Sequence, residues 1–432
     1  MSAASVDPPD HAPGRRAFEA SRALLGSPRF TQALTEAIVG VALAAFAVRA
    51  LLGWPGSLAV LAGLVVLAAL SLASQPERIE WRGVLPISLI ALFSLLTISV
   101  IWSQYTWATV GGIVYALAYG FLGVYLALVR DLIQLVRAVG NALRVILTTS
   151  FVLEVLSGII FDTPLLWLGI TGDLASGGPV QGLAGTRNAF AFLGALAVLS
   201  FWIEVRTRSV SRGLSTYSLT LAGATIVFAR SPVALLVLAA VLIVGLALVI
   251  IRRQKAVARR ATQSVLLISA AVFGVLAWVF RGPLVGVVDA AADVEERTSV
   301  WSAVGDLVAQ QPVLGWGWVG PWPTEVYPFS SVRSSSGVQP DSALNAYADV
   351  WLQLGLAGII VLLAALGLAF VRAWLVAADR RSTVYVWPAL TLVLVATASM
   401  TESYLLFEGG LLLFVTSAFA AARNRSWRGR FD

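Results

Sequence analysis

Long apolar stretches, separated by short polar turns, recur along the 432-residue chain. Most of them run for about 20 residues, the length that a helix needs to cross a bilayer. A helix is the expected form because backbone groups in lipid must satisfy one another's hydrogen bonds. The pattern predicts an all-α, polytopic membrane protein with about twelve transmembrane helices. We place these helices at 33–52, 55–74, 84–102, 107–128, 138–158, 187–205, 214–229, 231–251, 263–280, 346–371, 384–403 and 405–422.

The distribution of charge supports this membrane topology. Only 12% of the residues are charged, about half of the share in soluble domains, and 58% are hydrophobic. With the N-terminus placed in the cytoplasm, 23 of the 30 basic residues fall on the inner side, as the positive-inside rule requires. We therefore expect a multi-pass protein of the inner (plasma) membrane with both ends in the cytoplasm. The net charge of +7 is explained by this bias and does not indicate a nucleic-acid partner.

The windows organise the chain into one transmembrane domain, 33–422, between two tails. Residues 1–32 are polar, so we expect a disordered cytoplasmic tail without a cleaved signal peptide, and 423–432 form a basic cytoplasmic tail. The largest segment without a span is 281–345, an extracytoplasmic loop between the ninth and tenth helices. Within it, Glu296–Gln310 predicts an amphipathic helix. Its apolar stripe consists of Val300, Trp301, Val304, Leu307 and Val308.

The tenth predicted helix begins with a polar face. Asn345, Asp349 and Gln353 are spaced four residues apart, which places them on one side of a helix. Lipid does not tolerate such a face, so it must meet another surface. We expect an interior groove shared with a substrate; the alternative is that these side chains bond only to neighbouring helices.

Three arginines, Arg187, Arg230 and Arg297, stand at outer positions. An arginine there opposes the charge bias, and at membrane depth it costs about 3 kcal/mol, so each should have a partner. A diphosphate would suit because guanidinium groups bind phosphate oxygens in bidentate geometry and keep their charge. The alternative is that each arginine pairs with a carboxylate or a lipid headgroup, although no acidic residue adjoins Arg187 or Arg230 in the sequence.

Carboxylates near the outer surface supply the acid/base candidates. They are Glu295, Glu296, Asp341, Asp349, Glu402 and Glu408. Asp341 and Asp349 are the better candidates because they flank the polar start of the tenth helix. Glu154 is an intramembrane carboxylate, a class that is functional by default, although pairing with Arg144 is a structural alternative.

Two further residue types bear on the chemistry. The chain has no cysteine, its one histidine is His11 in the N-terminal tail, and we see no paired-carboxylate motif, so we expect no metal site and no cofactor. The stretch PVLGWGWVGPWP carries three tryptophans, of which Trp316 is the first. Indole rings stack on sugars, but packing within the loop is the favoured explanation.

Several local patterns resemble the O-antigen ligase and O-antigen polymerase family of membrane glycosyltransferases. They cover a fragment near residue 100 and roughly 180–370. The stretches are IWSQYTWATVGGIVYAL (101–117), GTRNAFAFLGALA (185–197), ARSPVALLVLA (229–239), ERTSVWSAVGDLVAQQPVLGWGWVG (296–320) and NAYADVWLQLGLAG (345–358). Each pattern is weak alone, but their order and the large loop between the ninth and tenth helices make the set specific.

The resemblance implies a glycan donor linked to undecaprenyl diphosphate and an acceptor glycan or lipid on the outer face, in surface polysaccharide biosynthesis. The three arginines would bind the diphosphate, with Arg297 also catalytic, and no metal would be needed. Asn188, Asn345, Asp349, Gln353 and Trp316 would contact the substrates. Membrane lipids would surround the protein.

The chain departs from the family pattern at the position of the catalytic base. The family carries a histidine directly before the helix asparagine, and here that position is Leu344. Asp341 is our substitute, because an ionised carboxylate at the same place is able to take the acceptor proton.

The alternative function is a transporter or flippase for a lipid-linked or anionic solute, with a scaffold protein third. We see neither the two similar halves nor the broken mid-membrane helices of a common transporter.

Overall fold

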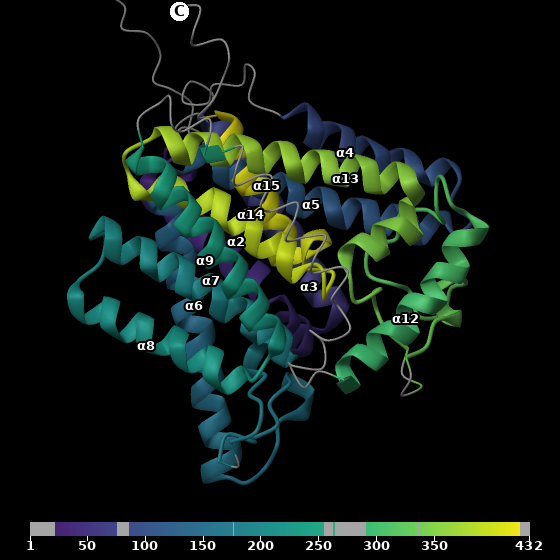
Figure 1. The fold of residues 1–432 in the computed structure, drawn as a ribbon, viewed down its shortest axis with the longest axis horizontal. Helices are drawn as coiled ribbons and strands as arrows, with labels where there is room; N and C mark the ends of the chain where they lie inside the picture. The colour runs from purple at the N-terminus through teal and green to yellow at the C-terminus, as the bar shows by residue number, and fades with distance from the viewer. Residues whose placement is uncertain are drawn as a thin grey trace, which may run out of the picture.

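The computed structural model describes residues 22–75, 86–175, 177–254, 262–263, 291–334, 337 and 339–423. Over these residues the chain folds into helices joined by turns, with one isolated β-bridge between Leu165 and Ile170 (Figure 1). The all-α prediction is therefore confirmed for this part of the chain. Residues 1–21 and 424–432 of the two tails lie outside it, as does most of the predicted ninth helix, so the expected number of twelve spans stays a prediction.

Six helices within the described residues are long and apolar enough to cross a membrane. They are α3 (Ala45–Ser74), α5 (Thr106–Val129), α6 (Leu132–Val155, continued by the π-helical turn Leu156–Ile160), α7 (Arg187–Thr207), α9 (Pro232–Arg253) and α13 (Ala346–Asp379). Shorter helices complete the bundle: α2 (Pro28–Leu43), α4 (Ile87–Ile98), α8 (Arg212–Ala229), α14 (Trp387–Ala398) and α15 (Glu408–Arg423). The described parts of the predicted windows fall on helices, with shifts at the ends, but the first window, 33–52, is divided between α2 and α3 at Ala44.

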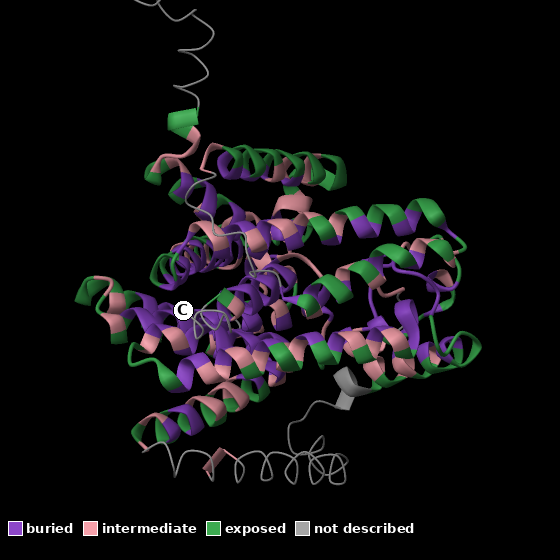
Figure 2. Cartoon of the chain, turned by 90° about the horizontal axis from the view of Figure 1, so that it is seen from above, coloured by how far each residue is buried: buried purple, intermediate pink, exposed green. Residues whose placement is uncertain are grey.

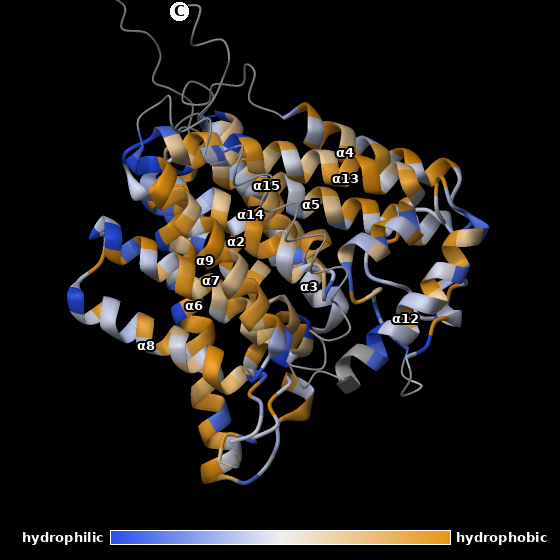
Figure 3. Cartoon of the chain, in the orientation of Figure 1, coloured by the Kyte–Doolittle hydropathy of each residue, from blue (hydrophilic) through white to orange (hydrophobic). Residues whose placement is uncertain are grey.

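The outer surface of the bundle is apolar, as a lipid-facing surface must be. Along α9, for example, Leu242 and Ile243 are 62% and 66% exposed, and α3 exposes Val66 and Leu70. Figure 3 shows hydrophobic residues along the helices, with hydrophilic residues gathered at helix ends and near α12. The buried residues lie inside the bundle (Figure 2). Helices α7, α14 and α15 are rich in them. A protein with this surface is a multi-pass membrane protein.

Helix α12 (Ala291–Gln310) lies to one side of the bundle and confirms the predicted amphipathic helix (Figure 1). Four residues of the predicted stripe are buried: Val300, Val304, Leu307 and Val308. They form a separate apolar cluster with aromatic side chains of the following loop. The helix begins earlier than the predicted Glu296, because the sequence pattern marks only the part that packs.

A glycine breaks α13 and receives this loop. Gly355 has φ 64 and ψ −161, a conformation for which only glycine is suited. A Cβ at this position would lie 2.3 Å from the backbone of Val313. The break releases backbone groups of α13 that the loop then satisfies. The bonds run from Trp316 N to Leu352 O (3.0 Å), Gly317 N to Gln353 O (2.8 Å), Leu356 N to Pro312 O (2.9 Å) and Ala357 N to Val313 O (3.1 Å).

Arg144 does not pair with Glu154, the structural alternative for that carboxylate. Arg144 pairs with Glu204 of α7 and donates from Nε to Ser218 Oγ (2.7 Å). Glu154 instead accepts from the backbone N–H of Gly172 (3.1 Å) in the loop after α6. Pairing between Arg144 and Glu154 is wrong because their separation along one helix amounts to roughly 15 Å.

Candidate functional site

The polar face of α13 starts at its N-cap. Asn345 Oδ1 accepts from the backbone N–H groups of Tyr347 (2.9 Å) and Ala348 (3.3 Å), a standard use of asparagine at this position. The preceding residue, Leu344, has φ 51, and its side chain packs on the apolar cluster of α12. The position that carries a histidine in the family pattern is therefore a packing residue here.

Asp349 is fully buried and bonded to protein on both oxygens. Its Oδ1 accepts from Trp322 Nε1 (2.7 Å) and Gln353 Nε2 (2.8 Å), and its Oδ2 accepts from Ser403 Oγ (2.8 Å). Asp349 therefore does not face the expected open groove. The tryptophan-rich loop and the turn after α14 lie against this face instead, where the alternative had named neighbouring helices.

Gln353, also fully buried, holds the same loop. Its Oε1 accepts from the N–H groups of Val319 (2.7 Å) and Gly320 (3.1 Å), and its Nε2 donates to Gly320 O (3.0 Å). These bonds occupy the side chain, so Gln353 does not face a groove either. Asp349 and Gln353 position the loop between α12 and α13.

Trp316 packs within this loop rather than lying open to a sugar. It is 7% exposed, and its Nε1 donates to Leu307 O (3.1 Å). Its ring meets Tyr327 edge-on at 5.5 Å, and its carbonyl accepts from the Tyr105 hydroxyl (2.8 Å). The favoured explanation of loop packing is what the structure shows, and a substrate contact of Trp316 is not supported by its burial.

Arg297, on α12, is bound to the two turns that face it. Its Nη1 donates to the carbonyls of Leu344 (3.2 Å) and Thr401, and its Nη2 pairs with Glu402 Oε1 (2.9 Å). The side chain is 11% exposed. Arg297 thus has a carboxylate partner 105 residues away, which is the alternative to a diphosphate partner.

Glu402, in the turn after α14, joins three parts of the chain. Besides Arg297, it accepts from Asn188 Nδ2 (2.9 Å) at the start of α7. Asn188 Oδ1 in turn accepts from Ser231 Oγ (2.8 Å) at the start of α9. We call this hydrogen-bonded series, Arg297–Glu402–Asn188–Ser231, the polar chain. The sequence indicates that Glu402 is an outer carboxylate, but it carries no signal for the partners, which lie 105 and 214 residues away.

The polar chain brings the three outer arginines into one region. Arg187 and Arg230 precede Asn188 and Ser231 directly, so their Cα atoms lie about 3.8 Å from those of two bonded residues. Arg187 is the first residue of α7 and is half-buried. Arg230 is exposed and ends α8 with φ 45, a backbone conformation that non-glycine residues rarely adopt.

Asp341 lies beside the polar chain with an exposed side chain. Its backbone carbonyl is fixed by the N–H of Trp322 (2.8 Å). Burial raises the pKa of Glu402 above its usual range, and the charge of Asp341 raises it further. The guanidinium of Arg297 and the amide of Asn188 act in the opposite direction. The exposed Asp341 therefore lies close enough to the buried Glu402 to raise the pKa of Glu402.

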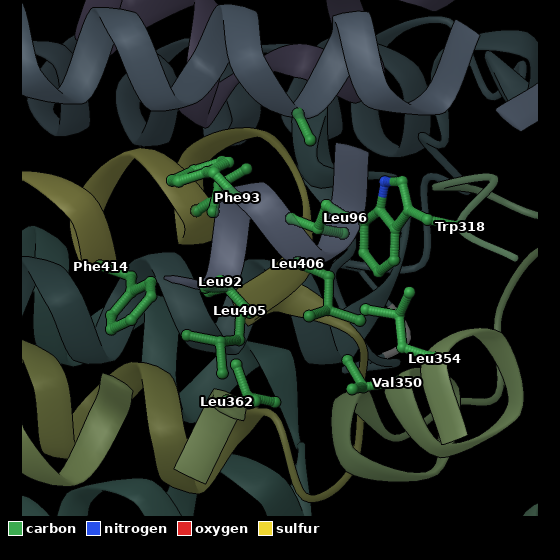
Figure 4. Close-up of a pocket in the computed structure, with 12 residues that line it drawn as sticks. Leu92, Phe93, Leu96, Trp318, Val350, Leu354, Leu362, Leu405, Leu406 and Phe414 are labelled. Carbon is green, nitrogen blue, oxygen red and sulfur yellow. The ribbon is translucent and has the colours of Figure 1, made fainter. Parts of the chain in front are cut away.

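A small apolar cavity lies next to Trp318, between α4, α13 and α15 (Figure 4). Its volume is about 20 Å³, and leucines from four elements line it, among them Leu405 and Leu406 of the 3₁₀ turn η8 (Tyr404–Leu406). It is too small and too apolar for a diphosphate. Within the described ranges no three His, Cys, Asp or Glu side chains group as metal ligands would. The chemistry that the site offers is thus one of arginines and carboxylates.

Comparison with known proteins gives one family model that matches part of this region. The sequence model described as O-antigen ligase matches residues 217–363. The match includes Arg230, Arg297, Asp341 and the start of α13, and it leaves Arg187 and Glu402 outside. No curated protein matches the chain.

Proposed function

We propose, from the match of residues 217–363 to the O-antigen ligase family model, that the chain transfers or polymerises a glycan on the outer face of the membrane. The donor is a glycan on undecaprenyl diphosphate and the acceptor is a hydroxyl of a second glycan or lipid. The observation that supports the proposal is the polar chain, because it joins Arg297 to the residues that directly follow Arg187 and Arg230, and because the exposed Asp341 lies near its Glu402.

In this proposal, Arg187 and Arg230 bind the diphosphate. Both begin or end a helix at the surface of the site, where a phosphate group is able to reach them. Guanidinium groups fixed in advance stabilise the negative charge that grows on the leaving diphosphate. Arg297 contributes its charge from the other side, while its bonds to Glu402 and two carbonyls keep it in place.

The transfer itself needs one bond formed and one broken. The acceptor oxygen bonds to the anomeric carbon, and the bond from that carbon to the diphosphate oxygen breaks with its electron pair leaving on the diphosphate. The hydroxyl proton passes to Asp341, which is exposed and replaces the missing histidine. Glu402 is a positioning residue that holds Arg297 and Asn188. Asn345 caps α13 with its oxygen, and its amide nitrogen is proposed to face the acceptor.

The test begins with deletion of the gene and analysis of the surface glycan. Short units on the lipid carrier indicate a polymerase, and full-length chains stranded on the carrier indicate a ligase. An unchanged glycan contradicts the proposal and favours the transporter. Complementation with Arg187→Gln or Arg230→Gln should restore neither product. Arg333→Gln, an exposed arginine elsewhere in the same loop region, is the matched control and should restore the wild-type glycan.

A further inference from the structure

A second polar site lies at the opposite end of the bundle from α12. It is a cavity of about 300 Å³ between the turn from α5 to α6, the 3₁₀ turn η7 (Thr383–Val386) and the end of α15. The start of α5 contacts the loop after α12, since Tyr105 bonds Trp316. The 24 residues of α5 then carry the chain roughly 36 Å to the cavity. The two sites therefore belong to opposite membrane faces.

The cavity is amphipathic. Its polar side carries the guanidinium groups of Arg130 and Arg423 and the hydroxyls of Ser382 and Tyr385. Its remaining lining is Asp131 and an apolar set, namely Ala127, Leu132, Ile133, Val384 and Ala420. A volume of this size falls at the lower end of the range for small-molecule sites, about 300–1,000 Å³. The occupant should therefore join a charged group to an apolar one.

The charge of the cavity favours an anion. Arg130 is 9% exposed and bonds neutral oxygens: Nε to Thr35 Oγ1 (3.1 Å), Nη2 to Thr31 Oγ1 (3.1 Å) and Nη1 to Gln134 Oε1 (3.3 Å). The two nearby carboxylates already have donors: Asp131 caps α6, where it accepts from Gln134 N (2.8 Å), and Glu36 accepts from Asn141 Nδ2 (3.0 Å). A buried guanidinium whose direct partners are neutral gains from an added anion.

Arg423 supplies a second cation with donors to spare. Its Nη1 donates to the carbonyls of Ala127 (2.9 Å) and Leu128 (3.2 Å), and its other nitrogens have no partner among the residues that the structure describes. Arg380 adds a third positive charge at the rim, where its guanidinium lies 5.6 Å from the ring centre of Tyr385.

We propose that this cavity binds the phosphate headgroup of an anionic phospholipid in the leaflet opposite the glycan-transfer site. Basic pockets between transmembrane helices are suited to such headgroups. The apolar lining distinguishes a lipid from free phosphate, because Leu132 and Ile133 offer the glycerol and acyl region a hydrophobic surface that an inorganic ion cannot use. Ile133 is 42% exposed at the edge of the cavity, which leaves a way in from the membrane. This site does not depend on the glycosyltransferase proposal.

The test measures thermal unfolding of the purified, delipidated protein with added lipid. Phosphatidylglycerol should raise the unfolding temperature, whereas phosphatidylcholine and inorganic phosphate should not. Arg423→Gln should weaken phosphatidylglycerol binding about tenfold, the loss expected for one charge-assisted hydrogen bond. Arg206→Gln, an exposed arginine in the last turn of α7, is the matched control and should behave as the wild type.

A second variant keeps the proposal open to refutation if Arg423→Gln does not fold. Ser382→Asp places a negative charge on the exposed polar rim without touching the bonds of Arg423, and it should abolish the lipid-dependent shift. Equal stabilisation by phosphatidylglycerol and phosphatidylcholine would overturn the proposal. So would a full response in both cavity variants, and a response to inorganic phosphate as large as the response to lipid would assign the cavity to a free anion instead.

Discussion

Replacing Glu402 by glutamine tests whether the polar chain holds the site together. The carboxylate accepts from Arg297 Nη2 and Asn188 Nδ2, both at 2.9 Å. Both donors reach the same oxygen, Oε1, so glutamine of the same shape keeps an acceptor for each of them and removes the negative charge. Arg297 would keep its bonds to Leu344 O and Thr401 O and lose its ionic partner.

The expected magnitude follows from these contacts. Each hydrogen bond to a charged group contributes about 1.5–3 kcal/mol, and removing one member of a fully buried pair costs about 3–5 kcal/mol. The two side chains keep 11% and 17% exposure, so water can partly replace the lost partner. We therefore expect Glu402→Gln to lower the free energy of unfolding by about 2–4 kcal/mol.

A double-mutant cycle with Arg297→Gln isolates the pair. If the two side chains act on each other, the double variant should lose about 1–2 kcal/mol less than the sum of the single losses. Unfolding of the detergent-solubilised protein provides the free energies, and surface glycan from a complemented deletion strain provides the activity. Glu325→Gln, an exposed carboxylate in the same loop, is the control. Additive losses, or a Glu402→Gln variant as stable as the wild type, would refute the role of the polar chain.

Two further predictions address the base and the broken helix. Asp341→Asn should abolish glycan transfer at a normal protein level, while Asp306→Asn, also exposed, should not; wild-type glycan from the first variant would remove Asp341 from the mechanism. Gly355→Ala should reduce thermal stability by at least ~1–3 kcal/mol, since it adds strain at φ 64 to a clash with Val313, and an unchanged unfolding temperature would contradict this.

The helices of this protein could be predicted from the sequence because their signals are local. An apolar run of about 20 residues predicts a spanning helix whatever surrounds it. The stripe from Val300 to Val308 likewise predicted the amphipathic helix, and the structure buries all of its residues except Trp301, which is half-buried. The three outer arginines also stood out locally, since each is a charge placed where an apolar window or a predicted helix begins or ends.

The partners of the polar residues were decided by the tertiary structure alone. Asp349 meets Trp322 and Ser403 rather than a groove, because Gly355 breaks α13 and lets the loop bond its backbone. Arg297 meets Glu402 from 105 residues away, and no periodicity relates the two positions. Sequence patterns register which side of a helix is polar, but the choice of partner depends on which distant segment packs there. For this protein, the sequence by itself determined an all-helical membrane chain, and the packing of α12 and its loop decided which of its polar groups bond within the fold.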